Sequence, residues 1–174
     1  LEVRDILKQQ GITGLMVTHD QEEAFAVSDK VGVMRDGVLQ QWDDPYTLYH
    51  EPANRFVASF IGLGRFIEGR ALSPEQVATE FGDIQGNRAY PWEPGTLVDV
   101  LLRPDDVLPA PASALRGKIL HKTFTGATSL VQLQLPSGTV VDAGFPSHAE
   151  LLPGDTVGVR LDMSHLVAFP RLAG

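Results

Sequence analysis

The spacing of apolar residues changes character once along the chain, at Gly62. Before that point, helical and strand-like patterns follow one another. The apolar run at 15–17 is too short for a buried helix but typical of a buried strand, and Asp36-Gly37 between two apolar runs predicts a two-residue hairpin turn. Gly11 is expected to end the first helix. The elements expected here are helices at 1–10, 21–28, 45–50 and 52–61, and strands at 15–18, 31–35 and 38–42.

Beyond Gly62, short apolar or alternating runs are broken by Gly, Pro and Ser at close intervals. Such spacing is typical of a small β-barrel or β-sandwich. A cap pattern at 73–76 favours a short helix, and the Pro- and Ala-rich segment 104–114 is expected to divide this β region into two unequal lobes. The expected strands lie at 66–72, 97–103, 117–124, 129–135, 139–143, 156–161 and 166–169.

The residues that follow the run at 15–17 are the first candidates for a functional site. Asp20 suits a helix N-cap, and Glu23 three residues later completes a capping-box pattern. His19 is therefore expected where a strand's carboxyl end meets a helix's amino end, a place where α/β folds bind ligands and anions are favoured. Taken alone, one histidine there is more often a solvated loop residue. A capped helix start explains the neighbouring carboxylates, Glu22 included, better than a metal site does.

Composition narrows the function classes. The 174 residues suffice for one medium domain or two small ones. A net charge of −8 argues against nucleic acid as a partner, because its phosphate backbone attracts basic surfaces. No apolar run approaches the roughly 20 residues that span a bilayer, and no signal peptide is expected. The absence of cysteine excludes a disulfide framework and thiolate zinc sites, and the five scattered histidines show no metal spacing.

The first region closely resembles the C-terminal end of the nucleotide-binding subunit of ATP-binding cassette (ABC) importers. The blocks that carry the resemblance are Thr18-His19-Asp20, Ser28-Asp29-Lys30-Val31, Val33-Met34-Arg35-Asp36-Gly37 and the run from Pro52 to Gly62. Trp42-Asp43-Asp44 departs from the Gly-Thr usual in that family. The resemblance implies that His19 is the switch histidine, which contacts the γ-phosphate of ATP.

The second region resembles the transport-associated OB-like domain of the same subunits. The matching residues are Leu102-Arg103-Pro104-Asp105-Asp106, Gly117-Lys118-Ile119, Leu152-Pro153-Gly154-Asp155 and Leu166-Val167-Ala168-Phe169-Pro170. The two resemblances together imply an α+β protein. Its expected parts are a C-terminal remnant of an α/β nucleotide-binding core at 1–62 and an OB-like all-β barrel domain at 63–174.

These resemblances imply the C-terminal, regulatory part of an importer's ATP-binding subunit, nearest in general appearance to ferric-iron importers, with polyamine, sulfate and sugar systems as rivals. The phosphate loop, the signature motif and the Mg²⁺-binding segment do not occur in the sequence, so this chain alone is expected neither to hold a cofactor nor to hydrolyse ATP. In the full-length protein the resemblance implies ATP and Mg²⁺ as cofactors and His19 as a catalytic residue. The implied partners are membrane-spanning permease subunits and a second copy of the chain. The resemblance also implies that the protein lies at the cytoplasmic face of the membrane and is not inserted into it.

Two other functions stay open. Thr125, Thr128 and Ser129 lie around Gly126 and form a candidate site for a small oxyanion, as in relatives of the OB-like domain that bind molybdate. The alternative is an ordinary hairpin in which threonine suits strands. The other alternative is that the chain is a structural dimerisation unit only. Because the sheet neighbours of 15–18 would lie upstream, residues 1–62 are expected to be partly disordered or held by a second copy.

Overall fold

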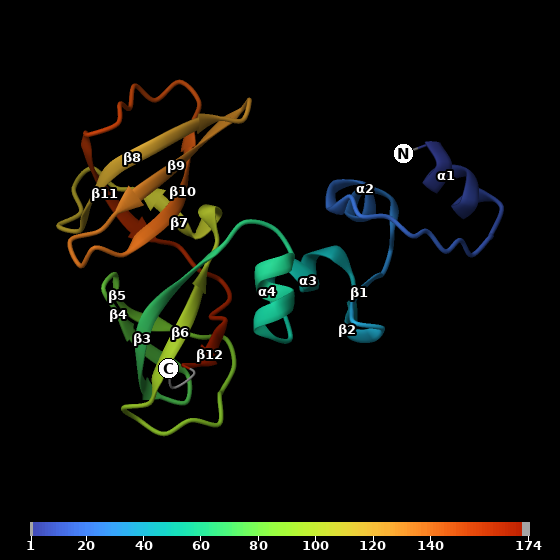
Figure 1. Ribbon diagram of the computed structural model, residues 1–174, viewed down its shortest axis with the longest axis horizontal. Coiled ribbons are helices and arrows are strands. Elements are labelled where there is room, and N and C mark those ends of the chain that lie inside the picture. Colours follow the sequence, from blue (N-terminus) through green and yellow to red (C-terminus); the bar gives the residue numbers. More distant parts are fainter. Residues whose placement is uncertain (1, 172–174) are drawn as a thin grey trace. The chain divides into compact units, whose positions relative to one another are not determined.

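The computed structural model describes residues 2–171, and the chain divides into two compact units, Leu1–Gly62 and Leu63–Gly174 (Figure 1). The described residues of the first unit form four short helices and one hairpin. Its elements are α1 (Glu2–Gln9), α2 (Gln21–Val27), β1 (Val31–Arg35), β2 (Val38–Asp43), α3 (Pro45–His50) and α4 (Arg55–Phe60). Among the described residues, no helix is long and apolar enough to cross a membrane.

Local sequence determines most boundaries of the first unit. The side chains of Asp20, Asp44 and Asn54 each accept a hydrogen bond from the backbone N–H three residues later, which caps α2, α3 and α4. The predicted hairpin is confirmed: Asp36 and Gly37 have φ values of 51° and 76°, as a type I′ turn requires.

The end of α1 also follows the prediction. Gly11 has φ 63°, and its N–H donates to Lys8 O at 3.2 Å. The N–H of Ile12 donates to Leu7 O at 2.9 Å, which completes a Schellman motif. The carboxylate of Asp29, after α2, lies 2.8 Å from a nitrogen of each of the two cations on α1, Arg4 and Lys8.

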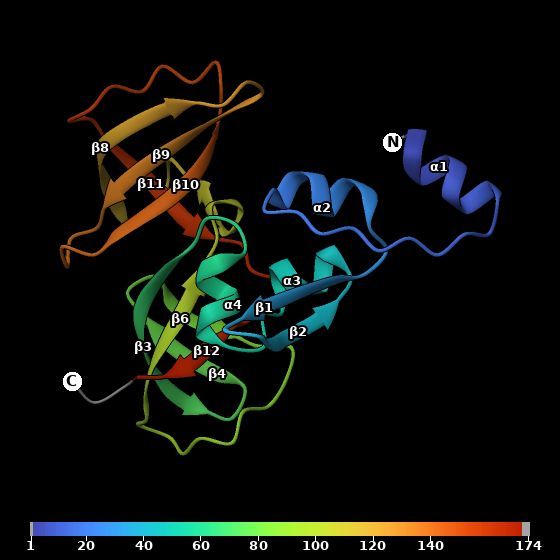
Figure 2. The same ribbon diagram turned by 45° about the vertical axis from the view of Figure 1, so that its right-hand side comes forward.

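A small core holds the first unit together. The hairpin covers α3 and α4 (Figure 2), so that Val33 of β1 packs against Leu48 of α3 and against Val57 and Ile61 at α4. These four side chains are almost completely buried, and Phe25 of α2 packs against them. Each buried aliphatic side chain contributes roughly 1.5–3 kcal/mol to folding.

The expected strand at 15–18 does not form. Residues 12–20 are neither helix nor strand, and the side chains of Leu15 and Val17 are 86% and 93% exposed. A strand needs a hydrogen-bonded neighbour, and none pairs with this run in the described part of the chain. The α/β core expected ahead of the barrel is therefore not seen; the first unit has one antiparallel pair of strands.

The second unit consists of two five-stranded antiparallel sheets (Figure 1). In spatial order the first sheet contains β12 (Ala168–Pro170), β6 (Leu97–Leu102), β3 (Arg65–Ser73), β4 (Gln76–Thr79) and β5 (Gly82–Gln85). The second contains β10 (Val140–Pro146), β9 (Thr128–Gln134), β8 (Arg116–Phe124), β11 (Thr156–Leu161) and β7 (Val107–Pro109). A 3-10 turn, η1 (Pro104–Asp106), joins β6 to β7. One continuous core contains residues of both sheets, among them Val100, Val107, Val131 and Val159.

The β region predicted from the sequence is confirmed, with three differences. Each expected strand overlaps an observed one, but β4, β5 and β7 were not expected. The expected helix at 73–76 is instead the turn between β3 and β4, because pairing with β3 extends the chain from Gln76 onward. The segment 104–114 does not separate two lobes, since it contains η1 and β7 and its Val107 is completely buried in the shared core.

Candidate functional site

The segment that carries His19 is built around a hydroxyl group. Thr18 Oγ1 accepts from the N–H of Asp20 at 3.0 Å and donates to Glu23 Oε2 at 2.6 Å. Asp20 Oδ1 accepts from the N–H of Glu23 at 3.0 Å. The predicted N-cap is confirmed, and the predicted reciprocal bond from Glu23 runs through Thr18 instead of reaching Asp20 directly.

This arrangement leaves the imidazole of His19 accessible. The residue is exposed, and no hydrogen bond or ion pair of its ring is found within residues 2–171. Asp20 and Glu23 are both used in capping, and the described residues contain no group of three His, Asp or Glu side chains placed to hold a metal ion.

Gln21, the first residue of α2, lies against the end of α4. Its amide nitrogen donates to Phe60 O at 2.5 Å, and its amide oxygen accepts from the N–H of Gly62 at 2.9 Å. The carbonyl of Phe60 belongs to the last turn of α4, where carbonyls lack helical partners. The side chain of Gln21 therefore caps a helix about 40 residues away in sequence, an interaction that sequence reasoning missed.

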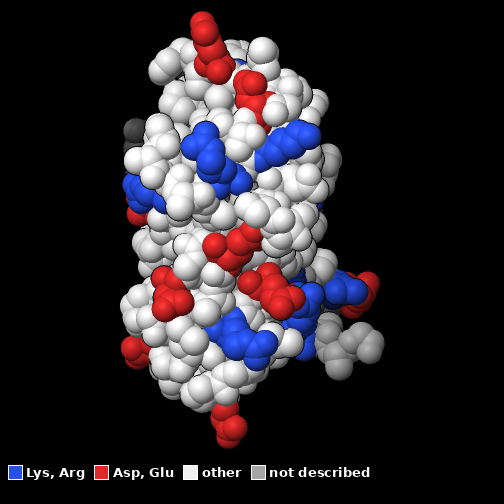
Figure 3. All heavy atoms as spheres, turned by 90° about the vertical axis from the view of Figure 1, so that its left-hand side faces the viewer, with Lys and Arg blue, Asp and Glu red and all other residues white. Residues whose placement is uncertain are grey.

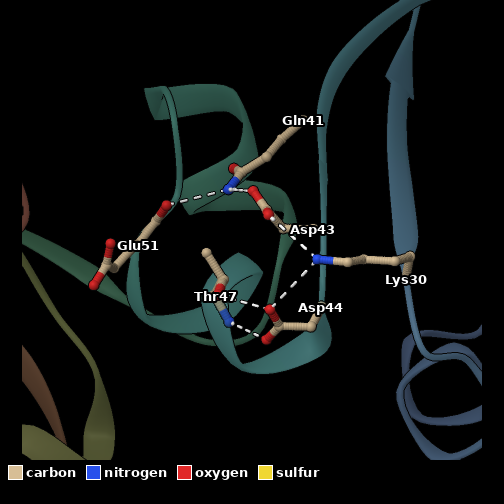
Figure 4. A network of polar contacts seen from close by, with 6 residues as sticks. All are labelled: Lys30, Gln41, Asp43, Asp44, Thr47 and Glu51. Atoms are coloured by element: carbon tan, nitrogen blue, oxygen red, sulfur yellow. Dashed lines mark hydrogen bonds and ion pairs between the residues drawn. The ribbon is translucent and has the colours of Figure 1, made fainter.

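A second glutamine makes the same pairing at the base of the hairpin (Figure 4). Gln41 Nε2 donates to Glu51 O at 3.2 Å, and Gln41 Oε1 accepts from the N–H of Ala53 at 2.7 Å. Beside it, Lys30 Nζ lies 3.8 Å from carboxylate oxygens of both Asp43 and Asp44. The hydrogen bonds that Asp44 accepts from the backbone and side chain of Thr47 lower the pKa of its carboxyl group. This network joins the end of β2 to the start of α3.

The candidate oxyanion residues do not all converge. Thr125 Oγ1 donates to Thr128 O at 2.9 Å and lies 3.1 Å from Thr128 Oγ1, so these two hydroxyls are together at the exposed tip of the β8–β9 hairpin. Ser129 faces the barrel interior, is 0% exposed, and its Oγ has no hydrogen-bond partner among the described residues. Lys122 is the cation nearest to this turn in the sequence, and its side chain donates to Ala149 O at 2.8 Å.

A polar pair lies at the junction of β6 and η1, where Arg103 is buried and Asp106 is half-buried. Arg103 is 3% exposed, and its Nη1 donates to Leu63 O at 3.1 Å at the start of the second unit. The backbone N–H of Arg103 donates to Asp106 Oδ2 at 2.7 Å. Burial raises the pKa of the Asp106 carboxyl to about 6, against the opposing effect of this hydrogen bond. Arg103 therefore has a structural role, because it joins the start of the second unit to the junction of β6 and η1.

Comparison with known proteins identifies the class. Residues 100–169 match the family model of the TOBE domain. Together with relatives that align along the whole chain, this match shows that the chain belongs to the C-terminal region of ABC importer ATP-binding subunits.

Two groups of importer subunits are represented among the relatives. The chain is 35% identical over 176 residues to the Fe(3+) ions import ATP-binding protein FbpC of Streptomyces avermitilis, covering 100% of this chain and 50% of that protein. It is 39% identical over 153 residues to the spermidine/putrescine import ATP-binding protein PotA of Lawsonia intracellularis, covering 79% of this chain and 41% of the relative. The chain thus spans about half the length of the curated relatives it matches.

A solved structure supports the fold of the second unit. The cytoplasmic molybdate-binding protein ModG, with molybdate bound, superimposes with a TM-score of 0.52 at 14% identity, over 62% of this chain and 96% of that one. At this identity the likeness concerns the fold, which is OB-like.

Proposed function

We propose that this chain is the C-terminal, regulatory part of the ATP-binding subunit of an ABC importer, in which the TOBE domain follows the end of a nucleotide-binding core. The observation that carries the proposal is the alignment of the whole chain, Thr18-His19-Asp20 included, with an importer ATP-binding subunit at 35% identity. ATP and Mg²⁺ are the cofactors of the longer protein, and permease subunits in the membrane, together with a second copy, are its partners.

His19 is the residue of this chain that would act on the nucleotide. An exposed imidazole that has no partner among the described residues can donate a hydrogen bond to a γ-phosphate oxygen. Such donors stabilise the charge that develops during phosphoryl transfer. The capping network of Thr18, Asp20 and Glu23 fixes the backbone on its C-terminal side. The residues present therefore fit a nucleotide contact, while the phosphate cradle belongs to the preceding part of the relatives.

A fusion protein tests this function. The part of the Streptomyces avermitilis FbpC that precedes the aligned region is joined ahead of Leu1, and ATP turnover is measured for the parent fusion, His19→Ala and the control His148→Ala. Loss of one such donor lowers kcat by about a hundredfold, so we expect that loss for His19→Ala and none for the exposed His148. Equal turnover of all three proteins would remove the assigned role of His19.

For the transported substrate we propose ferric iron, because a ferric-iron subunit aligns over 100% of the chain at 35% identity. Polyamines are the competing class, because a spermidine/putrescine subunit aligns over 95% of the chain at 33% identity. The test is genetic complementation: the fusion is expressed in strains lacking the ATP-binding subunit of a ferric-iron or of a spermidine importer, each with its own permease. Restoration of iron uptake alone supports the proposal, and restoration of spermidine uptake alone refutes it.

A second candidate function is binding of a small oxyanion at the β8–β9 hairpin. It is favoured by the 3.1 Å approach of the Thr125 and Thr128 hydroxyls at a turn where Gly126 has φ 102°, on a fold shared with a molybdate-binding protein. Calorimetric titration of the chain with molybdate, tungstate, sulfate and phosphate tests it, with Thr125→Val as the variant. The absence of heat with all four anions ends this alternative.

A further inference from the structure

The glutamine that follows the His19-Asp20 pair is bonded to the last residues of the first unit. The side chain of Gln21 forms hydrogen bonds with the backbone on both sides of Ile61: it donates to the carbonyl of Phe60 and accepts from the N–H of Gly62. Its own position is fixed because the neighbouring Asp20 caps α2. The start of α2 and the end of α4 are thus joined through one side chain.

The next residues of the chain are held in the second unit. Leu63 O accepts from Nη1 of the buried Arg103 at 3.1 Å. At Gly64 an added Cβ would lie 2.9 Å from the same nitrogen, so a side chain there would displace the Arg103 guanidinium. The covalent linker at 62–64 therefore has one anchor in each unit, Gln21 in the first and Arg103 in the second.

We propose that Gln21 is a positioning residue that couples the His19 segment to the linker between the two units. A displacement of the α2 start would pull directly on Phe60 and Gly62, because both partners of the Gln21 amide are backbone groups. The left-handed conformation of Gly62, with φ 66°, is the point where α4 ends and the linker begins. The coupling itself is a property of this chain; its use in sensing nucleotide rests on the proposed function.

Gln41 provides a matched control within the same unit. It makes the same pair of bonds, to Glu51 O and to the N–H of Ala53, across Pro52. If Gln21 acts locally, Gln21→Ala raises the amide exchange rate of Gly62 roughly fivefold, the loss expected for one hydrogen bond, and leaves Ala53 unchanged. Gln41→Ala produces the opposite pattern. An unchanged Gly62 rate in Gln21→Ala, or equal responses of both amides to each variant, overturns the proposal.

The coupling to the His19 segment is tested by a double-mutant cycle measured by NMR on the same chain. Asp20→Ala removes the cap of α2 and is expected to speed Gly62 exchange at least twofold, whereas Asp44→Ala, which removes the matching cap of α3, does not. In the Gln21→Ala background Asp20→Ala has no further effect. Equal effects of Asp20→Ala in both backgrounds refute the coupling.

If Gln21→Ala does not fold, Gln21→Glu replaces it. This variant keeps an acceptor for Gly62 and loses the donor to Phe60. The carbonyl ¹³C shift of Phe60 should therefore change while Gly62 stays protected, and an unchanged Phe60 shift contradicts the proposal.

In the ATP-binding fusion, a non-hydrolysable ATP analogue should alter Gly62 exchange in the parent but not in Gln21→Ala, at equal occupancy. A change of equal size in both refutes the nucleotide-sensing role. A fusion that binds no nucleotide contradicts the proposed function and leaves the amide results on the chain to decide the coupling.

Discussion

Replacing Asp106 by Asn removes an ionisable group whose charged form is disfavoured in the second unit. Burial raises the pKa of Asp106 from its ordinary value of 3.8 to about 6, and the nearby Asp105 and Asp162 carboxylates add to the shift. The folded state therefore binds the Asp106 proton more tightly than the unfolded state does. The contribution of Asp106 to stability is therefore fully present below pH 3.8. That stability is lost as the pH rises through about 6.

The size of this effect follows from the shift. A change of one unit in pKa corresponds to about 1.4 kcal/mol, so the ionisation of Asp106 lowers the unfolding free energy by up to about 3 kcal/mol between pH 3.8 and neutrality. Asn in its place still presents an oxygen to the N–H of Arg103, which now donates to Asp106 at 2.7 Å. We therefore expect Asp106→Asn to gain stability over the parent at pH 7.5 and to differ little from it at pH 4.

Urea unfolding at several pH values measures this difference. In a Trp42→Phe background the remaining tryptophan, Trp92, is 9% exposed in the core of the second unit and reports on that unit. Asp83→Asn on β5 makes the same charge change at an exposed position and serves as the control. Parallel pH profiles for the parent and Asp106→Asn, or the same profile change in Asp83→Asn, would show that burial at Asp106 is not the cause.

Three further predictions concern the packing of the second unit and the ion pairs of Asp29. Gly69→Ala should lower the unfolding free energy in a urea titration by about 1–3 kcal/mol, because the added Cβ would lie 2.6 Å from Val77 Cγ1. Gly144→Ala is the control and should be nearly neutral, because its nearest contact would be at 3.5 Å. Ser129→Ala removes a buried hydroxyl without a partner and should leave the thermal midpoint equal or higher; a clear decrease would indicate an unrecognised bond. The pKa of Asp29 is lowered by its bonds to Lys8 and Arg4 on α1. The protection of the α1 amides against hydrogen exchange should therefore fall as the pH drops below 3.8, and in Asp29→Asn this protection should not depend on pH.

How much of the fold the sequence predicts depends on how far apart the interacting residues lie. The hairpin at Asp36-Gly37 and the cap at Asp20 are formed by neighbours in sequence, and both were predicted correctly. The strand expected at 15–18 depends on pairing with distant residues, and it does not form. β4 and β5 were missed for a related reason: they are four residues long and exist because β3 pairs with β4.

The candidate sites show the same division. Gln21 forms hydrogen bonds with backbone groups 39 and 41 residues away, and no pattern in the local sequence predicts these two bonds. The separation of Ser129 from Thr128, by contrast, follows from a rule available at the outset, since successive residues of a strand face opposite sides. Once β9 begins at Thr128, only one of the two hydroxyls can lie outside the barrel with Thr125, and the apolar alternation at Val131 and Leu133 places Ser129 inside. A site for a small anion at this hairpin would therefore have to use Thr125, Thr128 and backbone groups of the turn, without Ser129.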